Sequence, residues 1–432
     1  MSITDPTSVI DDSPIHLEAT ESRAARRARL STGALLVVFG VALFIAGLAT
    51  RGTASFALSD AFAAVQLPTI TLPGLPTVLV AAVLTLLAGA GFLSGRLWGR
   101  SRTAAATVAG LAVLIGFITW AVAGNSLAFP VANQLSGTVA LATPLVLGAL
   151  AGVLCENAGV VNVAIEGQFL VAAFTAATVG SVTGSITVAL IAAVLAGMAM
   201  GALLAVFSIK YWVDQVVLGV VLNLLASGIT GFLFDQLVQP NGATLNAAPT
   251  MQRLAIPLLS QIPLIGPVLF DQTILVYLAI ASVAVVWFLL YRTRWGLRVR
   301  SVGEHPEAAD TVGINVRAVR WQAVLVGGLF AGLGGAFFTI GSTGGFIKDI
   351  TVGNGFIALA ALIMGRWHPV RAALMAVFFG FVTQMSTQLG TMNAPMPREL
   401  LGLFPYLATV IAVAGLIGRS RGPAADGVPY TK

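Results

Sequence analysis

Charged side chains are scarce in this sequence. Asp, Glu, Lys and Arg together make up 9% of the 432 residues, whereas 57% are hydrophobic and the mean hydropathy is +0.93. A soluble globular protein with so few charges and so much apolar surface would aggregate. The composition therefore excludes a soluble domain and predicts a protein that crosses a membrane several times.

Cysteine, histidine and lysine are also rare, which excludes several kinds of chemistry. The single cysteine, Cys155, cannot form an internal disulfide, and the 3 widely separated histidines cannot build a His/Cys metal site. No lysine lies in a G-x-x-x-x-G-K-[ST] loop, so the usual cradle for ATP phosphates is missing. An intramembrane enzyme is disfavoured because no G-x-S-x-G motif is present and no histidine lies in an apolar run. We therefore expect no cofactor or metal in this chain, and any ATP and Mg²⁺ chemistry should belong to a partner.

Apolar runs of membrane-spanning length recur throughout. Because a hydrocarbon core about 30 Å thick takes roughly 20 helical residues to cross, we expect an all-α polytopic membrane protein with about 10–12 transmembrane helices. The run at 353–367 is short and starts at Gly353-Asn354-Gly355, so it fits a re-entrant half-helix as well as a full span. The expected spans are 33–50, 76–94, 103–123, 134–155, 160–180, 184–207, 216–238, 273–291, 319–341, 353–367, 370–390 and 402–418.

The cations are distributed unevenly between alternate loops. Cytoplasmic loops of membrane proteins carry an excess of Lys and Arg. With an inner N-terminus, nearly all of the 23 cations fall on the inner side, and the exceptions are Arg51, Arg253, Lys348 and Arg398. We therefore predict a multi-pass protein of the plasma membrane with both termini in the cytoplasm. The net charge of +6 then reflects topology rather than binding to nucleic acid.

Four regions follow from this pattern. Residues 1–32 and 419–432 are expected to be disordered cytoplasmic tails, 33–123 an accessory N-terminal helical region of open role, and 134–418 the core. Each half of the core has a Gly/Asn-broken polar patch leading into an apolar run, LCENAGVVNVAIEGQFL at 154–170 and TVGNGFIALAALIMG at 351–365. Paired interrupted segments are typical of transporters built on inverted repeats, although Gly-rich spans also resemble one another by chance.

The first of these breaks, at 156–168, places polar side chains between two spans with no cation nearby. Carboxylates and non-helical backbone at membrane depth are costly unless water or protein satisfies them. The segment is either an ordinary inner loop with exposed glutamates or a discontinuous segment that lines a substrate path. On the second hypothesis a neutral, hydrogen-bonding substrate passes Asn157, Asn162, Glu166 and Gln168, with Asn223 and Gln384 added from later spans.

A charged, helix-prone island at 291–316 interrupts the apolar sequence. Pro306 lies at a predicted first helical turn beside acidic residues, and Gly313 is placed to end that helix. A helix of about two turns is unstable alone and must pack on something. The island is either a surface link between spans or a coupling helix on which a cytoplasmic motor pushes. The residues expected to carry the coupling role are Gly303, Glu304, Pro306, Glu307, Ala308, Ala309 and Gly313.

Four segments in the same order resemble the membrane permeases of bacterial ABC importers. They are Glu156 to Gln168, Asp214 to Leu225, Gly303 to Val316 and Gly355 to Pro369. The resemblance is strongest to the nucleoside-type branch, which is related to the ribose and branched-chain amino acid permeases, and it covers most of 134–418. One departure is His368, where a more neutral polar residue is expected.

The resemblance implies a subunit of an importer. In that family two permease subunits, often non-identical, pair with two cytoplasmic ATPase domains, and a lipid-anchored or periplasmic binding protein delivers the substrate. It implies that 303–313 is the coupling helix and that 157–168 lies near the translocation path. Nucleosides are the implied substrates, while a pentose or other sugar or a branched-chain amino acid would need similar polar groups.

A different class of transporter remains as an alternative. In an ion-coupled secondary transporter Glu156 and Glu166 would be the titrating pair, and uptake would depend on protons or sodium rather than ATP. That hypothesis leaves the charged island without a role.

Overall fold

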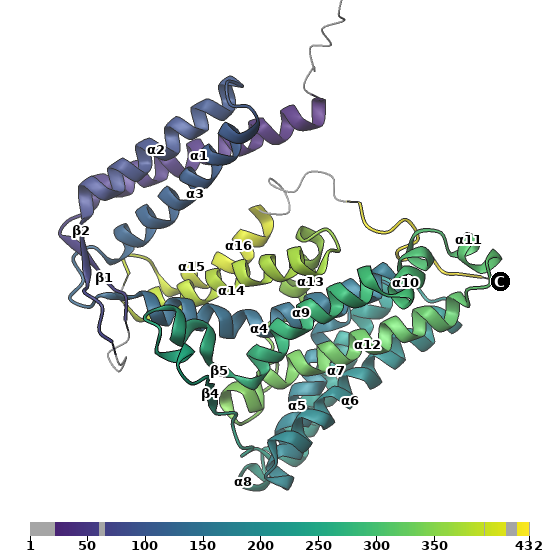
Figure 1. Ribbon diagram of the computed structural model, residues 1–432. Helices are drawn as coiled ribbons and strands as arrows, with labels where there is room; N and C mark the ends of the chain where they lie inside the picture. Colours follow the sequence, from purple (N-terminus) through teal and green to yellow (C-terminus); the bar gives the residue numbers. More distant parts are fainter. Residues whose placement is uncertain (1–21, 60–64, 393, 412–420, 432) are drawn as a thin grey trace, which may run out of the picture.

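The computed structural model describes residues 22–59, 65–392, 394–411 and 421–431, and helices dominate it (Figure 1). Ten helices in this part are long and apolar enough to cross a membrane, which confirms the predicted all-α polytopic class. Turns of π-helix extend α6, α7 and α12 to Lys210, Val238 and Thr343. The ten are α1 (Arg23–Ala49), α2 (Gly74–Ser94), α3 (Gly99–Val122), α4 (Val131–Asn157), α5 (Ile165–Thr183), α6 (Ile186–Ala205), α7 (Gln215–Leu233), α9 (Ile274–Arg292), α12 (Val316–Phe337) and α14 (Pro369–Thr391).

The remaining elements are short. β1 pairs antiparallel with β2 and parallel with β3, and β4 pairs antiparallel with β5. The expected span at 402–418 begins as α16 and continues into residues outside the described part. The short helices are α8 (Gly242–Leu245), α10 (Arg294–Glu304), α11 (Pro306–Thr311), α13 (Asn354–Met364), α15 (Arg398–Gly402) and α16 (Phe404–Ile411), and the strands are β1 (Thr53–Ala57), β2 (Ile70–Pro73), β3 (Phe129–Pro130), β4 (Arg253–Ala255) and β5 (Asp271–Thr273).

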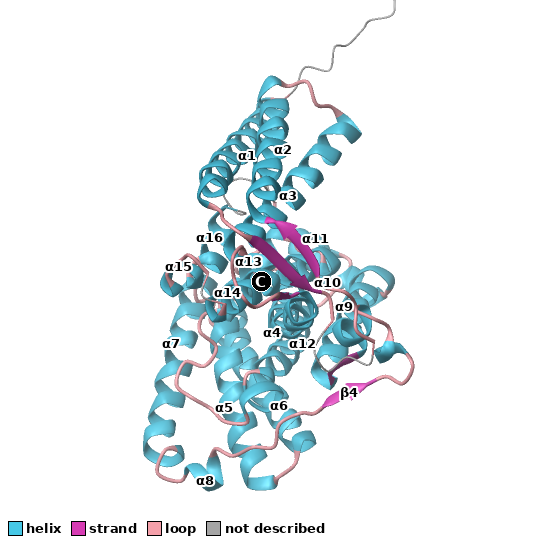
Figure 2. Ribbon diagram, turned by 90° about the vertical axis from the view of Figure 1, so that its left-hand side faces the viewer, coloured by secondary structure: helices cyan, strands magenta, loops and turns pink. Residues whose placement is uncertain are grey.

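Helices α1 to α3 form a bundle beside the core. Figures 1 and 2 show that this bundle stands away from the other helices and joins them at the end that carries β1 and β2. The join is apolar: the ring of Phe117 lies 5.6 Å from that of Phe404, and Ile118 and Val122 share a buried cluster with Leu389. Apolar burial of this kind attaches the bundle at one end.

Helix α4 is the centre of the core and packs against α9, α12, α13 and α14. Its Leu147, Leu150 and Leu154 are fully buried. Helix α12 crosses α6 so closely that a Cβ on Gly332 would lie 2.6 Å from the Ala193 carbonyl oxygen. Small residues at such crossings let helix backbones approach each other inside a membrane.

Each half of the core contains a helix that begins after a break. After α4 the chain is non-helical until Ile165, where α5 begins, and after the π-helical end of α12 at Thr343 it is non-helical again until Asn354, where α13 begins. The N-terminal ends of α5 and α13 meet, since a Cβ on Gly355 would lie 2.4 Å from the Glu166 nitrogen. At 11 residues, α13 spans only about 16 Å and cannot cross a bilayer alone.

From the point where they meet, α5 and α13 lead to opposite ends of the core. Just past the end of α13, the Trp367 carbonyl oxygen accepts a hydrogen bond from Asn157 Nδ2 (3.1 Å) at the end of α4, close to α10 and α11. Near the end of α5, Ser181 Oγ accepts a hydrogen bond from the Ala247 N–H (2.9 Å) beside α8. This opposed pair of interrupted segments is the arrangement expected of inverted repeats.

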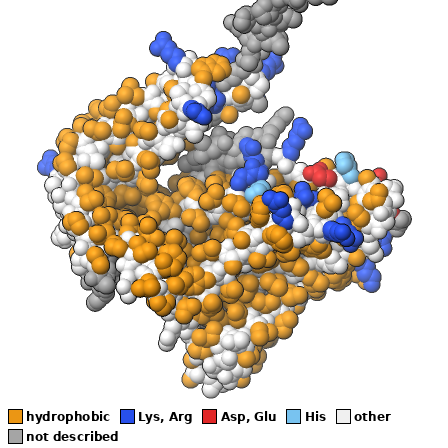
Figure 3. All heavy atoms as spheres, viewed as in Figure 1, with side chains coloured by type: hydrophobic (Ala, Val, Ile, Leu, Met, Phe, Trp, Pro, Cys, Tyr) orange, Lys and Arg blue, Asp and Glu red, His pale blue; other side chains and the backbone are white. Residues whose placement is uncertain are grey.

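Side-chain types are segregated along the molecule. Hydrophobic side chains cover the broad middle of the face in Figure 3, while Lys and Arg gather toward α10 and α11 and at the free end of the α1–α3 bundle. The segregation and the ten apolar helices support a multi-pass membrane protein.

The C-terminal residues differ from expectation. Residues 421–431 pack against the core instead of forming a disordered tail, and the Ala425 N–H donates to the Gly303 carbonyl oxygen at 2.8 Å. Of the expected N-terminal tail, residues 1–21 lie outside the described part, and Arg23 to Thr32 form the start of α1 instead of a disordered tail. The interpretation of the C-terminal segment as disordered is therefore wrong for 421–431.

The α6–α12 crossing gives a test of the fold. In Gly332→Ala the new Cβ would meet the backbone of Ala193 and Val194, so we expect a loss of about 1–3 kcal/mol of stability. The thermal unfolding midpoint of the purified protein in detergent measures it. In Gly110→Ala the Cβ would meet no described atom within 4 Å, so this control should keep or slightly raise the midpoint. Equal behaviour of the two variants would contradict close packing at this crossing.

Candidate functional site

The non-helical segment 158–164 between α4 and α5 obtains hydrogen bonds from α7. Gln215 Oε1 accepts from the Val161 N–H (2.6 Å), and Asn223 Nδ2 donates to the Val163 carbonyl oxygen (3.0 Å). Asn223 Oδ1 also accepts from the Gly167 N–H at 2.8 Å, in the first turn of α5. Backbone groups freed from a helix at membrane depth need such partners. Asn223 on α7 therefore supplies hydrogen bonds that the backbone of the break and of the first turn of α5 would otherwise lack.

The Glu166 carboxylate joins α5 to α13. It accepts hydrogen bonds from the Thr351 hydroxyl and from the N–H groups of Gly353 (2.8 Å) and Gly355 (2.6 Å) at the start of α13. The first N–H groups of a helix have no partner within it, and their positive end of the helix dipole attracts a carboxylate. Glu166 thus caps α13 from the first turn of α5.

Asn157, Asn162 and Gln168 make their polar contacts inside the protein. Asn157 Nδ2 donates to the carbonyl oxygens of Val153 (2.7 Å) and Trp367 (3.1 Å). Asn162 and Gln168 are fully buried, and Asn162 Nδ2 donates to Gln168 Oε1 at 3.2 Å. Of the two hypotheses for 156–168, the discontinuous segment is the one observed. The role of its polar residues in a substrate path stays a prediction.

The predicted site residue Gln384 lies apart from this group. It packs against Gly137, where a Cβ would lie 2.4 Å from Gln384 Cδ. Gly137 precedes Asn157 by about 20 residues of α4, which is about 30 Å of helix. The structure therefore brings five of the six predicted path residues around one break, and Gln384 contacts a different level of α4.

Two polar pairs were not among the predicted site residues. Ser227 Oγ donates to Asp349 Oδ1 at 2.8 Å, and Lys348 Nζ lies 2.6 Å from Asp235 Oδ2. These pairs join α7 to the segment that leads down to the capped end of α13. The available signal was Asp349 directly before the second broken motif, at 351–365.

The charged island forms two helices rather than one. Helix α10 ends at Glu304, and α11 has 6 residues with Pro306 as its first. Gly303 is packed so closely that a Cβ would lie 2.1 Å from the Asn157 carbonyl oxygen. Ala309 is the buried residue of α11. Beyond α11, Gly313 has a φ of +84°, which glycine adopts readily.

The exposed part of the island is a small tip. It includes the predicted coupling residues Glu304, Glu307, Ala308 and Gly313, and the side chain of Val312 is 75% exposed. Val312 lies directly after the last residue of α11. Figure 1 places α10 and α11 at one extreme of the core.

A buried polar cluster near α10 was missed by the sequence analysis, which counted Arg320 with the loop cations. Arg320 is only 1% exposed, and it donates from Nε to the Ala158 carbonyl oxygen (3.1 Å) and from Nη1 to the Val428 carbonyl oxygen (2.9 Å). The Asp426 carboxyl group interacts with Arg320 and, on its other side, with the carboxyl group of Glu156. No sequence signal indicated that a residue of the expected tail returns to α4.

The Asp426 carboxyl group lies close to Glu156, Arg320 and Cys155. Burial raises the pKa of Asp426 to about 7, although the hydrogen bond with Glu156 and the charge of Arg320 act in the opposite direction. The packed position of Asp426 therefore favours its neutral form relative to an exposed aspartate.

His368, the departure noted in the sequence, has a packing role. Its ring stacks on Tyr291 at 5.2 Å between centroids, which joins the turn before α14 to the end of α9. Burial, and then the charge of Arg371, lower the pKa of His368. A neutral imidazole suits this aromatic stack.

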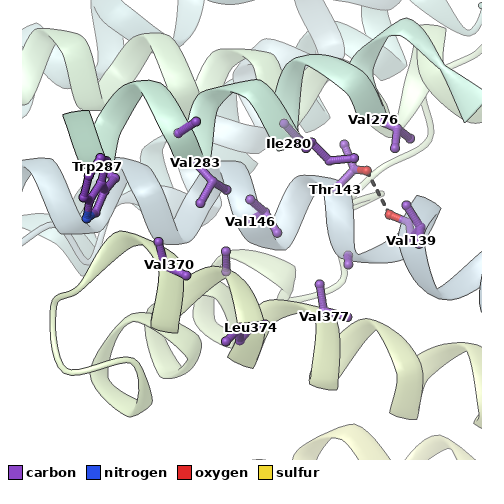
Figure 4. Close-up of a pocket in the computed structure, with 14 residues that line it drawn as sticks. Val139, Thr143, Val146, Val276, Ile280, Val283, Trp287, Val370, Leu374 and Val377 are labelled. Carbon is purple, nitrogen blue, oxygen red and sulfur yellow. Dashed lines mark hydrogen bonds between the residues drawn. The ribbon is translucent and has the colours of Figure 1, made fainter. Parts of the chain in front are cut away.

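A cavity of about 450 Å³ between α4, α9 and α14 is unsuited to a polar ligand (Figure 4). Apolar side chains such as Val146, Ile280 and Leu374 point into it. The one hydroxyl on its wall, Thr143 Oγ1, donates to the Val139 carbonyl oxygen at 3.0 Å. The candidate site is therefore the break and its surroundings rather than this cavity.

Comparisons with known proteins match the broken core. The family model described as the permease component of branched-chain amino acid transport systems matches residues 134–413. The guanosine ABC transporter permease protein NupQ of Bacillus subtilis is 40% identical over 304 residues, which cover 68% of this chain and 95% of that protein. The nucleoside ABC transporter permease protein NupC of Lactococcus lactis is 38% identical over 317 residues, 71% of this chain and 98% of that protein.

A more distant relative has a different named substrate. The glucose ABC transporter permease protein TsgB13 of Haloferax volcanii is 31% identical over 258 residues, 57% of this chain and 67% of that protein. No solved structure matches the chain.

The cap on α13 gives a prediction. Glu166→Gln replaces one accepting oxygen with an NH₂ group that faces N–H donors, so we expect a loss of about 1.5–3 kcal/mol of stability. Thermal unfolding of the purified protein in detergent measures it. Glu399→Gln, at an exposed position in α15, is the matched control and should leave the midpoint unchanged. A midpoint for Glu166→Gln equal to that of the control would show that the carboxylate is not needed as a cap.

The raised pKa of Asp426 makes the packing of 421–431 depend on pH. Because the packed state favours the neutral carboxyl, its stabilisation is complete below the ordinary pKa of 3.8 and is lost as pH rises through about 7. We expect hydrogen exchange at the Ala425 amide, corrected for its intrinsic rate, to be faster at pH 8 than at pH 5.5. In Asp426→Asn this difference should disappear. Equal protection of the wild type at both pH values would contradict the assignment.

Proposed function

Because the chain belongs to the family of permease components of branched-chain amino acid transport systems, we propose that it is the membrane-spanning subunit of an ABC importer for nucleosides. The family match spans both broken segments and the α10–α11 island. The observation that carries the proposal is this combination of an interrupted helical core with a firmly packed, exposed short helix.

Helix α11 is the proposed contact for the motor. Gly303 and Ala309 fix the island to the core, while Glu307, Ala308 and Val312 face outward. A motor shifts a transporter between conformations only if it binds one of them more tightly. A rigid tip can transmit such a difference, because the end of α10 abuts α4 next to the break.

The proposed assembly supplies what this chain lacks. Two cytoplasmic ATPase domains bind ATP and Mg²⁺, a second and non-identical permease subunit completes the path, and a substrate-binding lipoprotein delivers substrate from outside. Both termini and the island then lie in the cytoplasm, which agrees with the position of the cations toward α10 and α11 in Figure 3.

The polar face beside the break is the proposed path. Asn223 and Glu166 are partly exposed there, and the Ser227–Asp349 pair lies next to them. Hydroxyl and amide groups suit a neutral substrate with ribose hydroxyls and ring nitrogens. In the proposed arrangement Asn157, Asn162 and Gln168 support this face from behind.

Nucleosides are proposed because two relatives are named for guanosine or nucleosides, and this chain matches nearly the whole length of each. A sugar is the second candidate, since a relative at 31% identity is named as a glucose permease. An ion-coupled mechanism is disfavoured, because Glu166 is engaged as a helix cap and Glu156 accepts a hydrogen bond from Trp367 Nε1. Among the described contacts, Glu156 pairs with Asp426 and Glu166 pairs with backbone N–H groups, so the two glutamates do not form the titrating pair that this mechanism requires.

The test uses the complete complex in proteoliposomes. We expect ATP-dependent uptake of labelled guanosine that excess unlabelled nucleoside suppresses and excess glucose does not. Ala308→Trp should lower uptake at least about tenfold while the ATPase still hydrolyses ATP, because a bulky ring on α11 displaces the motor. Ala308→Ser is the matched small replacement and should transport normally. Full uptake by Ala308→Trp would remove the coupling role, and suppression by glucose alone would move the substrate to the sugars.

A further inference from the structure

Residues 421–431 lie where the island meets the core. Figure 1 shows this segment passing α10 and ending beside α11. The Ala425 N–H donates to the Gly303 carbonyl oxygen (2.8 Å), and the Ala424 N–H donates to Glu304 Oε2 (3.2 Å). Both contacts hold the last turn of α10, directly before α11.

The same segment also holds the break between α4 and α5. Val428 accepts a hydrogen bond from Arg320 Nη1, and Arg320 Nε donates to Ala158 in the break. A Cβ on Gly159 would lie 2.8 Å from Arg320 Nη2 and 3.0 Å from the Ala425 carbonyl oxygen. The segment therefore fits closely between α10, α12 and the broken backbone.

The fit depends on the buried guanidinium group of Arg320. A guanidinium that is 99% buried is costly unless an opposite charge or hydrogen-bond acceptors compensate it, and removal of one partner from such a group is strongly destabilising. The carbonyl oxygens of Ala158 and Val428 accept hydrogen bonds from Arg320, and the Asp426 carboxyl interacts with Arg320 and with Glu156 of α4. Chain ends are usually poorly ordered unless contacts of this kind hold them.

Apolar burial alone does not account for the docking. The segment Arg421 to Thr431 contains few large apolar residues, and Val428 is exposed. Its docking uses hydrogen bonds of its own backbone and of Arg320, and a hydrogen bond depends on direction. A contact of this kind defines a geometry more strictly than non-directional apolar packing does.

We propose that residues 421–431 form a strap that positions α10 and α11 on the break between α4 and α5, with Arg320 and Asp426 as its positioning residues. The inference rests on the proposed coupling role of α11. When the motor moves α11, the strap makes the broken segment move with it as one body. The strap stays docked through the transport cycle, and its loss weakens the transfer of motion from α10 and α11 to the break.

The test measures nucleoside moved per ATP hydrolysed by the reconstituted complex. Asp426→Ala should lower this ratio about fivefold or more, because the coupling between the two sites is lost while ATP hydrolysis continues. Thr431→Ala, at an exposed position past the strap contacts, should keep the wild-type ratio. The amount of protein in the membrane and its co-purification with the ATPase are measured for both variants.

A covalent tie separates positioning from a general loss of structure. Ala424 and Glu304 are both exposed and adjacent, so Ala424→Cys with Glu304→Cys can be joined by a short bismaleimide, while the native Cys155 is buried. The joined protein should transport with the same ratio as the unjoined double-cysteine protein, and the tie should restore that ratio when Asp426→Ala is added. If Asp426→Ala fails to accumulate, the tie in the wild-type background still provides the test.

Three results bear differently on the two proposals. An unchanged ratio in Asp426→Ala, with uncoupling by Ala308→Trp, overturns the strap and leaves the proposed function standing. Block of transport by the tie also overturns it, since the segment would then have to release during the cycle. Unchanged coupling in both Asp426→Ala and Ala308→Trp overturns the strap and the proposed coupling role of α11 together.

Discussion

Broken backbone inside a membrane must find its hydrogen bonds within the protein, and much of this structure depends on that constraint. Lipid offers no donors or acceptors, so each N–H or C=O freed at 158–164 needs a side chain or another backbone group. Gln215 and Asn223 provide them from α7, and Glu166 provides acceptors for the start of α13. The polar residues of the core are thereby arranged around the first turns of α5 and α13.

This arrangement links the membrane core to the surface that faces the proposed motor. The last residue of α4, Asn157, contacts both the turn after α13 and the buried Gly303 of α10. A displacement of α10 therefore reaches the end of α4 through backbone contact, without an intervening flexible side chain. Arg320 lies beside this contact and adds the C-terminal segment to it. The break and the island are thus neighbours in space although about 140 residues separate them in sequence.

Much of the fold could be predicted because local patterns carry it. Apolar runs of span length, the cation asymmetry and the Gly/Asn-broken motifs each depend on nearby residues alone, and the observed helices follow them closely. The turn at Pro306 and Gly313 was likewise visible as a start and an end of a short helix. The division of the island into α10 and α11 was not, since it depends on how Gly303 packs against α4. The choice between a loop and a discontinuous segment at 156–168 also required the partner residues on α7.

The contacts that tertiary structure alone decided are those between distant parts of the chain. Asp426 carries no local signal that it enters the core, and Arg320 looks like any cation at the edge of a span. Their burial depends on three surfaces that come together only after the helices pack. The sequence by itself determined a polytopic membrane protein with two Gly/Asn-broken motifs and a charged island, because hydropathy, glycine and proline act over a few residues. Which polar side chains cap, bridge or remain open was decided by packing, because a hydrogen bond needs its two atoms within about 3 Å.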